Sequence, residues 1–393
     1  MYRKRLVLPV IGASLFSLLL NGTGSPLAGA ELPDTVNVSL LEAYPQISSI
    51  RVEGPLQIIS PVSRRLGGQA YQATTRNGLI VIRPTATAKA VFQAPRVILK
   101  HPQGKPIAVQ AQTLAVRKYP GQLSLRANAK GKLQIVNRLG ARRYVALVVA
   151  SETLPGWPEE ALKAQAVLTQ THLSRYRNGD ALGDSTQQEA YLGSTHQRAE
   201  VDRAVNAVWG ETLTYRGQPI TPFYHAGCAG HTSDGHYFNP QKNPPWLSAI
   251  RCSYCRNAPF FKPTQTTIPQ SAFEHAFGAG PPRILQRDET GRPISIHSGN
   301  GQAMTGYAFW LKLGQRFGWG KAPGTRFSIR QLPNGDYAVR STGAGHGVGL
   351  CQWGAAGMAR AGKSYRDILH FYFPNTQLTG PHTSQAAPSR QAF

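Results

Sequence analysis

Acidic residues are scarce in this chain. Its 393 residues include 19 Asp and Glu against 43 Lys and Arg, which gives a formal net charge of +24. Three of the basic residues and none of the acidic ones lie in the first 30 positions, so a charge of +21 belongs to the rest. A surface of this sign attracts polyanions, either nucleic acid or an anionic polymer. Because the basic residues are spread along the chain, a merely solvated basic surface is the alternative.

Long apolar runs are also missing after the first 30 residues. The one near the start, residues 6–20, has 15 residues and contains Pro9 and Gly12, whereas a membrane-spanning helix needs about 20. It lies between basic residues 3–5 and the small residues 28–30, which is the layout of a secretory signal peptide over residues 1–30. An uncleaved N-terminal anchor is the alternative. We expect an exported protein of the periplasm or cell wall, with no nucleic acid partner and no membrane span after signal cleavage.

Cysteines are too few for a disulfide scaffold. Three of the four lie within 28 residues, in a His225-x-x-Cys228 pair and a Cys252-x-x-Cys255 pair that are separated by 23 residues. Three thiolates and one imidazole form a tetrahedral zinc set, and four protein ligands would make the zinc structural. A disulfide among the three cysteines, which an oxidising compartment favours, and free thiols are the alternatives. We expect Cys351 to be a small buried side chain.

The chain contains no internal repeat, and its first part reads as β-rich. From residue 36 to 137, short alternating segments are separated by Gly and Pro at strand-length intervals. We predict an α+β fold with a β-rich N-terminal region at 31–122 and a mixed α/β domain at 123–379. The Ser, Ala, Pro and Gln composition of residues 380–393 predicts a disordered tail.

Helix signals follow a near-continuous apolar run at residues 142–150, which ends at Ser151-Glu152. Pro158 suits a first helical position, and Glu159 and Glu160 suit the positive end of the helix dipole. This helix is predicted to end at 178–179, where Asn-Gly is a usual stop signal. Further helices are predicted at 197–208 and 365–371, with a β-rich stretch between them.

Three blocks of the sequence resemble one protein family. They are residues 144–167, with Val148-Val149-Ala150-Ser151-Glu152 and Trp157-Pro158-Glu159-Glu160; residues 224–234; and Gly345-His346-Gly347-Val348-Gly349 continuing to residue 355. These blocks are similar to the signature of the stage II sporulation protein D (SpoIID/LytB) family. Smaller agreements occur at 191–193 and 210–215. The resemblance covers roughly residues 123–378.

The resemblance implies lytic transglycosylase chemistry on the glycan strands of peptidoglycan (murein), with Glu152 as the acid/base. It also implies that Lys163, Tyr224 and Ser233 lie near the substrate. For His346, which alternates with glycines that let another chain approach closely, a structural role and a direct substrate role are both open. The family usually has Arg where this chain has Gln170, which puts the activity in question unless Arg175 or Arg177 substitutes.

A single carboxylate is sufficient for this chemistry. Ordinary glycosidases use two, one of which attacks the sugar or activates a water molecule. A lytic transglycosylase instead lets the 6-hydroxyl of the sugar attack the anomeric carbon, and such intramolecular attack reaches effective molarities on the order of 10⁵ M or more. Glu152 would then donate one proton and accept another.

Two other functions remain open. The first is a non-catalytic murein-binding protein that enhances a cell-wall amidase, as the LytB name in the family suggests. The second is a zinc hydrolase built on His225 and the cysteines. This second alternative is weak, because a catalytic zinc keeps an open position and thiolate-rich sets are usually structural.

Overall fold

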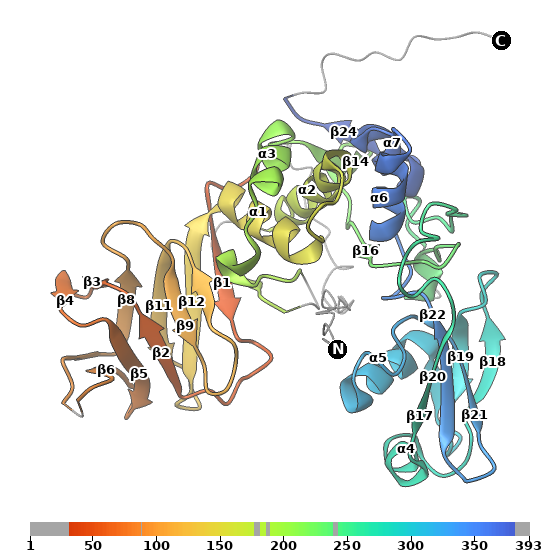
Figure 1. Cartoon of the computed structure of the whole chain (residues 1–393), viewed down its shortest axis with the longest axis horizontal. Helices are drawn as coiled ribbons and strands as arrows, with labels where there is room; N and C mark the ends of the chain where they lie inside the picture. The colour runs from red at the N-terminus through yellow and green to blue at the C-terminus, as the bar shows by residue number, and fades with distance from the viewer. Residues whose placement is uncertain (1–30, 88, 177–180, 186–188, 239–242, 382–393) are drawn as a thin grey trace, which may run out of the picture. The chain divides into compact units, whose positions relative to one another are not determined.

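The computed structural model describes residues 31–381, except 88, 177–180, 186–188 and 239–242. The predicted signal peptide, Arg177 and the tail beyond residue 381 lie outside the described residues. The helix predicted to end at 178–179 ends earlier, at Leu173, because residues 174–176 form a turn and bend. Strands and helices are mixed (Figure 1), in agreement with an α+β fold. Within the described residues, no helix is long and apolar enough to cross a membrane.

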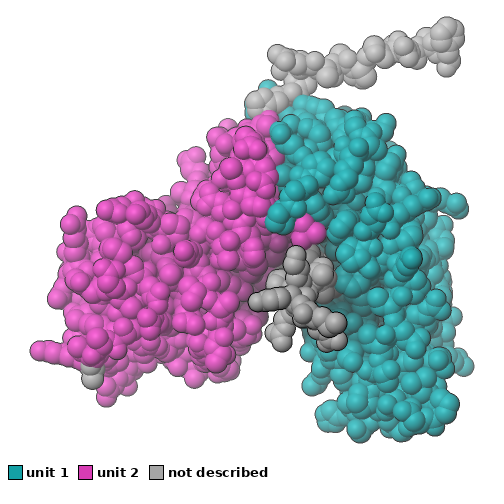
Figure 2. All heavy atoms as spheres, viewed as in Figure 1, with its two compact units in different colours: residues 1–30, 155–172, 210–393 teal, residues 31–154, 173–209 magenta. Residues whose placement is uncertain are grey.

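The chain forms two compact units (Figure 2). One unit contains residues 31–154 and 173–209, and we call it the sandwich unit. The other contains residues 155–172 and the described residues from 210 onwards, and we call it the helical unit. The predicted domain boundary at residue 123 stays a prediction.

Two β-sheets make up most of the sandwich unit. The first has seven strands, in the order β13 (Ala181–Gly183), β1 (Thr35–Leu40), β12 (Leu133–Gly140), β11 (Gln122–Ala127), β8 (Arg96–Lys100), β3 (Leu56–Ser60) and β4 (Arg64–Leu66). The second has six, in the order β10 (Arg117–Tyr119), β9 (Ile107–Gln110), β2 (Ser49–Glu53), β5 (Ala70–Arg76), β6 (Leu79–Pro84) and β7 (Phe92–Ala94).

Alternation along the strands decides which face of each sheet is buried. In β1, Val36, Val38 and Leu40 are buried and the residues between them are not, as the period of two in a strand requires. The sheets contact each other where β6 meets β8 and β11. The apolar core of this unit therefore lies between the sheets, and the other face of the seven-stranded sheet is polar.

Helix α1 (Ala141–Glu152) follows β12 without a loop, and nine of its 12 residues are buried. The helix contacts α3 (Ala199–Ala207) and the short 3-10 helix η1 (Gly193–His196). The predicted helix at 197–208 is confirmed as α3. The predictions did not include α1, because a helix that is buried on all sides lacks an apolar stripe with helical spacing.

The helical unit begins with α2 (Glu159–Leu173), directly after Pro158 as predicted. Its other helices are α4 (Gln270–Phe277), α5 (Gly306–Phe317), α6 (Gln352–Arg360) and α7 (Tyr365–Tyr372), with the 3-10 helix η2 (Gly235–Tyr237). Helix α7 confirms the helix predicted at 365–371. It starts with a capping box, in which Ser364 and Asp367 bind each other's backbone N–H.

The helical unit also contains small sheets. Their strands are β15 (Gln218–Pro219), β14 (Thr212–Tyr215) and β24 (Gln377–Thr379); β17 (Thr264–Ile268), β22 (Tyr337–Thr342) and β21 (Arg326–Gln331); and β18 (Arg283–Arg287), β19 (Pro293–His297) and β20 (Ala303–Thr305). A parallel pair, β16 (Tyr224–His225) and β23 (Leu350–Cys351), joins the start and the end of the long segment between them.

Candidate functional site

Glu152 is the last residue of α1, and its side chain is buried, with the residue 5% exposed. Its Oε1 accepts a hydrogen bond of 2.7 Å from the backbone N–H of Ala190. A carboxylate at the C-terminal end of a helix faces the negative end of the helix dipole. The N–H from a segment 38 residues away therefore offsets an otherwise unfavourable position.

The segment that provides this N–H is fixed to the sandwich. The Tyr191 hydroxyl donates to Asn137 Oδ1 over 2.6 Å, and the Asn137 amide donates to the carbonyl groups of residues 120 and 122. Gly193 has a positive φ of 64°, and a Cβ there would collide with the carbonyl oxygen of Lys118. Ala190 is thus held in place by the residues directly after it.

Arg198 binds the C-terminal end of α1. Its guanidinium donates to the carbonyl of Ala150 over 2.9 Å, to the carbonyl of Thr153 over 3.1 Å and to Thr153 Oγ1 over 2.8 Å. A cation at this end of a helix satisfies the last carbonyl groups and complements the dipole. Arg198 therefore fixes the turn that carries Glu152, although no sequence pattern indicated it.

A second buried carboxylate, Glu189, lies beside Ala190 and is 2% exposed. Burial raises the pKa of Tyr144 well above its usual value, and the charges of Glu189 and Glu152 raise it further. The ring of Tyr144 lies 5.5 Å from that of Tyr191. The environment of Glu152 therefore combines buried carboxyl groups with neutral tyrosines.

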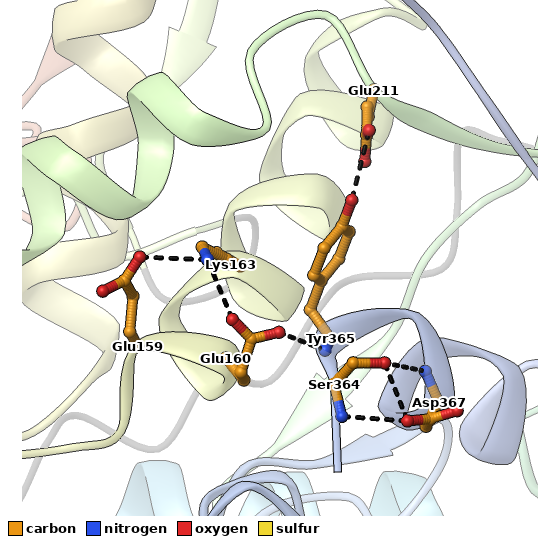
Figure 3. A network of polar contacts seen from close by, with 7 residues as sticks. All are labelled: Glu159, Glu160, Lys163, Glu211, Ser364, Tyr365 and Asp367. Carbon is orange, nitrogen blue, oxygen red and sulfur yellow. Dashed lines mark hydrogen bonds and ion pairs between the residues drawn. The ribbon is translucent and has the colours of Figure 1, made fainter. Parts of the chain in front are cut away.

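Lys163 in α2 lies in a network of polar contacts within the helical unit (Figure 3). Its Nζ is 2.8 Å from Glu160 Oε1 and 3.0 Å from Glu159 Oε1. Burial lowers the pKa of Lys163, but its bonds to these two carboxylates outweigh burial and raise the pKa. The other oxygen of Glu160 accepts the backbone N–H of Tyr365. The lysine predicted to contact substrate thus also connects the starts of α2 and α7.

His346 and Tyr224 contact each other next to the parallel strand pair. His346 Nε2–H donates to the carbonyl of Tyr224 over 2.8 Å, and its Nδ1 accepts the N–H of Val348 over 3.2 Å. Burial lowers the pKa of His346 to about 4, so the ring is neutral near pH 7. Both ring nitrogens bind backbone, which favours the structural role for His346 over the direct substrate role.

Ser233 is 1% exposed and lies in a buried polar network. Its hydroxyl donates to Asp288 Oδ2 over 2.5 Å, and Asp288 also accepts the backbone N–H of Arg292 over 2.8 Å. Arg292, itself 2% exposed, donates to the carbonyl groups of Cys228 and His231. Burial raises the pKa of Asp288, but these hydrogen bonds outweigh burial and lower the pKa. Ser233 and the backbone of Arg292 therefore bind the same carboxylate, and the Arg292 side chain binds the loop of Cys228.

Four cysteines form the second cluster of chemically active side chains. The Sγ atoms of Cys228, Cys252, Cys255 and Cys351 lie within 4.8 Å of one another, all four residues are buried, and all are free thiols. The predicted fourth ligand, His225, is not part of this group, and Cys351 takes its place. His225 Nδ1 lies 3.1 Å from the carbonyl of Val348, and its Nε2 has no hydrogen-bond partner within the part of the chain that the structure describes.

The surroundings of the four thiols suit a metal ion. A zinc ion bound by four thiolates at about 2.3 Å places the sulfur atoms about 3.8 Å apart. The Sγ atoms of Cys228 and Cys255 lie 3.4 Å apart. The backbone N–H groups of Cys228 and Gly354 both donate to Cys351 Sγ over 3.3 Å. Hydrogen bonds among the thiols lower the pKa of Cys252 and Cys255 and raise that of Cys228, and burial raises the pKa of Cys351. These residues fit a closed zinc site.

Comparisons with known proteins show which family this chain belongs to. A sequence model of the Stage II sporulation protein family matches residues 129–215, which include Glu152 and Lys163. An uncharacterized protein of Brachyspira hyodysenteriae is 32% identical over 259 residues, which cover 62% of this chain and 68% of that protein. The stage II sporulation protein D of Bacillus subtilis is 26% identical over 275 residues, or 63% of this chain and 76% of that protein. The chain belongs to the stage II sporulation protein D family.

A relative of lower identity has a different name. The amidase enhancer of Bacillus subtilis is 24% identical to this stage II sporulation protein D family member over 288 residues. The aligned part covers 59% of this chain but 40% of that protein.

Gln170 is the position at which the sequence departs from the family pattern. The residue is fully buried in α2, and its Oε1 accepts the backbone N–H of Gly210 over 2.7 Å. Gln170 thereby connects α2 to the start of the segment that leads into β14. In this stage II sporulation protein D family member, the position makes a buried backbone contact.

Proposed function

We propose that this chain is an exported, cell-wall-related enzyme, a peptidoglycan lytic transglycosylase, with Glu152 as its acid/base. The observation that supports this most is the buried carboxyl group at the end of α1. It lies inside the segment that matches the family, and two separate contacts fix it. The Ala190 N–H holds the carboxyl group itself, and Arg198 holds the turn around it.

In the proposed reaction, Glu152 first gives its proton to the glycosidic oxygen while the bond from that oxygen to the anomeric carbon breaks. Glu152 then takes the proton of the 6-hydroxyl of the same sugar, whose oxygen forms a new bond to the anomeric carbon. The product carries a 1,6-anhydro end, no water is consumed, and the carboxyl group returns to its protonated form. The substrate supplies the nucleophile, so a second carboxylate is not required.

Mass analysis of the products from purified murein tests this proposal. An anhydro-muramyl end is one water lighter than a hydrolysed end, so the mass assigns the reaction class. The Glu152→Gln variant should release roughly 10²- to 10⁴-fold less anhydro product, and Glu53→Gln, which removes a partly exposed carboxylate of the same unit, should release as much as the wild type. Hydrolysed ends from the wild type would contradict the proposal.

We also propose that Cys228, Cys252, Cys255 and Cys351 hold a structural zinc ion. Four thiolates leave no open position for substrate or water. The ion would connect the loop after β16 with the start of α6, and so support Tyr224 and His346 indirectly. Elemental analysis of protein purified under reducing conditions, without added zinc, tests this. A disulfide among these cysteines would replace the ion.

A second function is favoured by one observation, the relative named amidase enhancer. In that case the chain would bind murein without cleaving it and would increase the rate of a separate cell-wall amidase. Adding the protein to an amidase and murein distinguishes the two functions. Stimulation that persists in Glu152→Gln, together with an absence of anhydro ends from the wild type, would favour the enhancer.

A further inference from the structure

The polar face of the seven-stranded sheet is hollowed. A cavity of about 390 Å³ lies on this face, lined by residues of β1, β8, β11, β12 and β13. These strands are neighbours in the sheet (Figure 1). The lining residues alternate along the strands, as in Gln122, Ser124 and Arg126 of β11, so their side chains share one face.

The charge of this face has one sign. Arg96, Arg126 and Arg138 line the hollow, and no acidic residue does. Among the described residues, none of the three arginines forms an ion pair. Arg96 and Arg126 are directly opposite each other on neighbouring strands, an arrangement that destabilises a sheet when the charges are alike. The pair therefore does not stabilise the sheet, whereas binding of an anionic ligand would account for it.

Hydrogen bonds orient two of the guanidinium groups. The Nε of Arg96 donates to Ser124 Oγ over 3.0 Å, and the Nε of Arg126 donates to Gln134 Oε1 over 2.7 Å. Both bonds use Nε, which leaves the terminal Nη groups for the two oxygens of a carboxylate. Amide and hydroxyl groups of residues such as Asn37 and Gln122 line the rest of the hollow and suit sugar hydroxyl and acetamido groups.

The spacing of the positive charges indicates an extended ligand. Gln134 is directly opposite Arg126, and Arg138 lies four residues further along β12. At about 3.4 Å per residue, Arg138 is offset by about 14 Å along the strand direction from the Arg96 and Arg126 pair. A single small anion cannot contact both positions, but a polymer with repeated acidic groups can.

We infer that this face is a second binding site for murein, separate from Glu152, in which stem-peptide carboxylates bind Arg96, Arg126 and Arg138. The glycan strand then lies across β8, β11, β12 and β1 on their amide and hydroxyl side chains. The choice of ligand rests on the proposed function, but binding at this face does not require cleavage.

A sedimentation assay with insoluble murein tests the inference in the full-length Glu152→Gln protein, which leaves the murein intact. The murein is first treated with hydrofluoric acid, which removes phosphodiester-linked polymers and leaves carboxylates. The test variant carries Arg96→Gln, Arg126→Gln and Arg138→Gln. The matched control carries Arg76→Gln, Lys105→Gln and Lys130→Gln, three exposed basic residues of the same unit.

We expect the test variant to bind murein at least about tenfold more weakly, which equals about 1.4 kcal/mol, and the control to change by less than about twofold. Murein whose carboxylates have been converted to neutral amides should bind the parent protein as weakly as intact murein binds the test variant. The single variant Arg126→Gln should weaken binding in the same direction, which keeps the test valid if the triple variant folds poorly.

Three results would overturn the inference. One is an equal loss in the test and control variants, which would show attraction by net charge alone. Another is binding that hydrofluoric acid treatment abolishes, which would assign the face to a phosphate polymer. The third is unchanged binding in the test variant. A chain that makes no anhydro ends but shows the expected binding pattern would contradict the proposed function and leave this site standing.

Discussion

Both units of the molecule contain buried, chemically active side chains, but the contacts that hold these side chains differ. In the sandwich unit the buried carboxyl group of Glu152 accepts the Ala190 N–H at a helix end, and Arg198 binds the turn around it. In the helical unit four thiols lie within 4.8 Å of one another, and backbone N–H groups donate to one of them. Glu152 is the proposed acid/base, whereas the thiols form a closed set that suits an ion.

This difference suggests different roles, proposed chemistry for the Glu152 site and structural support for the four-cysteine site. A single titratable group with a few fixed contacts can change its charge without loss of the fold, since its partners stay in place. A group of four mutually dependent ligands cannot lose one member without affecting the other three. We therefore expect substitutions in the first site to change activity and substitutions in the second to change metal content and stability.

The largest expected effect is that of Glu152→Gln on activity. The amide keeps the shape of the side chain but has no proton to donate, so murein cleavage should fall by roughly 10²- to 10⁴-fold. The thermal midpoint should change little. Release of anhydro ends and thermal unfolding, both measured on the same preparation, check this prediction. A variant as active as the wild type would remove Glu152 from the mechanism.

The second effect concerns zinc. Cys351→Ala should lower the zinc content to less than about a tenth of an ion per chain, since the ion's binding energy contributes to folding. The thermal midpoint should fall by about 5 °C, as a loss of about 2 kcal/mol would produce in a unit of this size. His225→Ala is the matched control and should keep its zinc. The opposite pattern would restore His225 as the ligand.

The third effect concerns the pH dependence of stability that buried His346 gives the helical unit. The pKa of His346 in the folded protein is about 4, below the unperturbed value of about 6.5. The unfolded chain therefore binds a proton first, so the stabilisation is complete above about pH 6.5 and is lost as the pH falls toward 4. The loss should reach roughly 3 kcal/mol. Urea unfolding of the wild type and of His346→Gln across this pH range should show a larger loss in the wild type. Buried His225, whose pKa is also lowered by burial, should leave a remaining loss in the variant.

The fourth effect tests the support of the carboxyl site. Arg198→Ala removes the donor to the last carbonyl groups of α1, which should cost about 2 kcal/mol of stability. Cleavage should fall by about tenfold, since the Glu152 turn is less well fixed. Arg203→Ala, which removes an exposed arginine of α3, should behave like the wild type. Equal rates for the two variants would show that Arg198 does not position the site.

Lys163→Ala is expected to have the smallest effect. Lys163 is partly exposed and bound to Glu159 and Glu160, and such ion pairs contribute less than about 1 kcal/mol. We expect turnover to fall by about threefold, a measurable but minor change. Kinetic comparison with the wild type checks it, and unchanged turnover would remove Lys163 from the substrate site.

The sequence predicted parts of the fold that depend on local signals. Pro158 and the acidic residues after it placed the start of α2, and the pattern at 365–371 placed α7. The stretch between 208 and 365 was predicted as β-rich, but it also contains α4, α5 and α6. Helix α1 was missed because an apolar run without an amphipathic pattern does not distinguish a buried helix from a buried strand.

The candidate site was predictable only where its residues lie in one block. The resemblance singled out Glu152, but its partner Ala190 and the supporting Arg198 lie 38 and 46 residues away, and no local pattern connects them. The two short pairs around residues 225 and 252 suggested a local zinc set. In the structure Cys351, rather than His225, lies with the other three thiols, because β16 pairs with β23 and brings the chain back after 123 residues. The signal for this was a fourth cysteine directly after the Gly-His-Gly block.

The parallel pairing of β16 with β23 also sets the order in which the chain can fold. It closes a loop of more than 100 residues, and the entropy cost of closure rises with the logarithm of loop length. Contacts between residues so distant in sequence are expected to form slowly. Until Cys351 arrives, three thiols stand next to one another without their fourth member. In an oxidising compartment these thiols would be open to oxidation until then, so slow closure would favour a disulfide over the completed cluster.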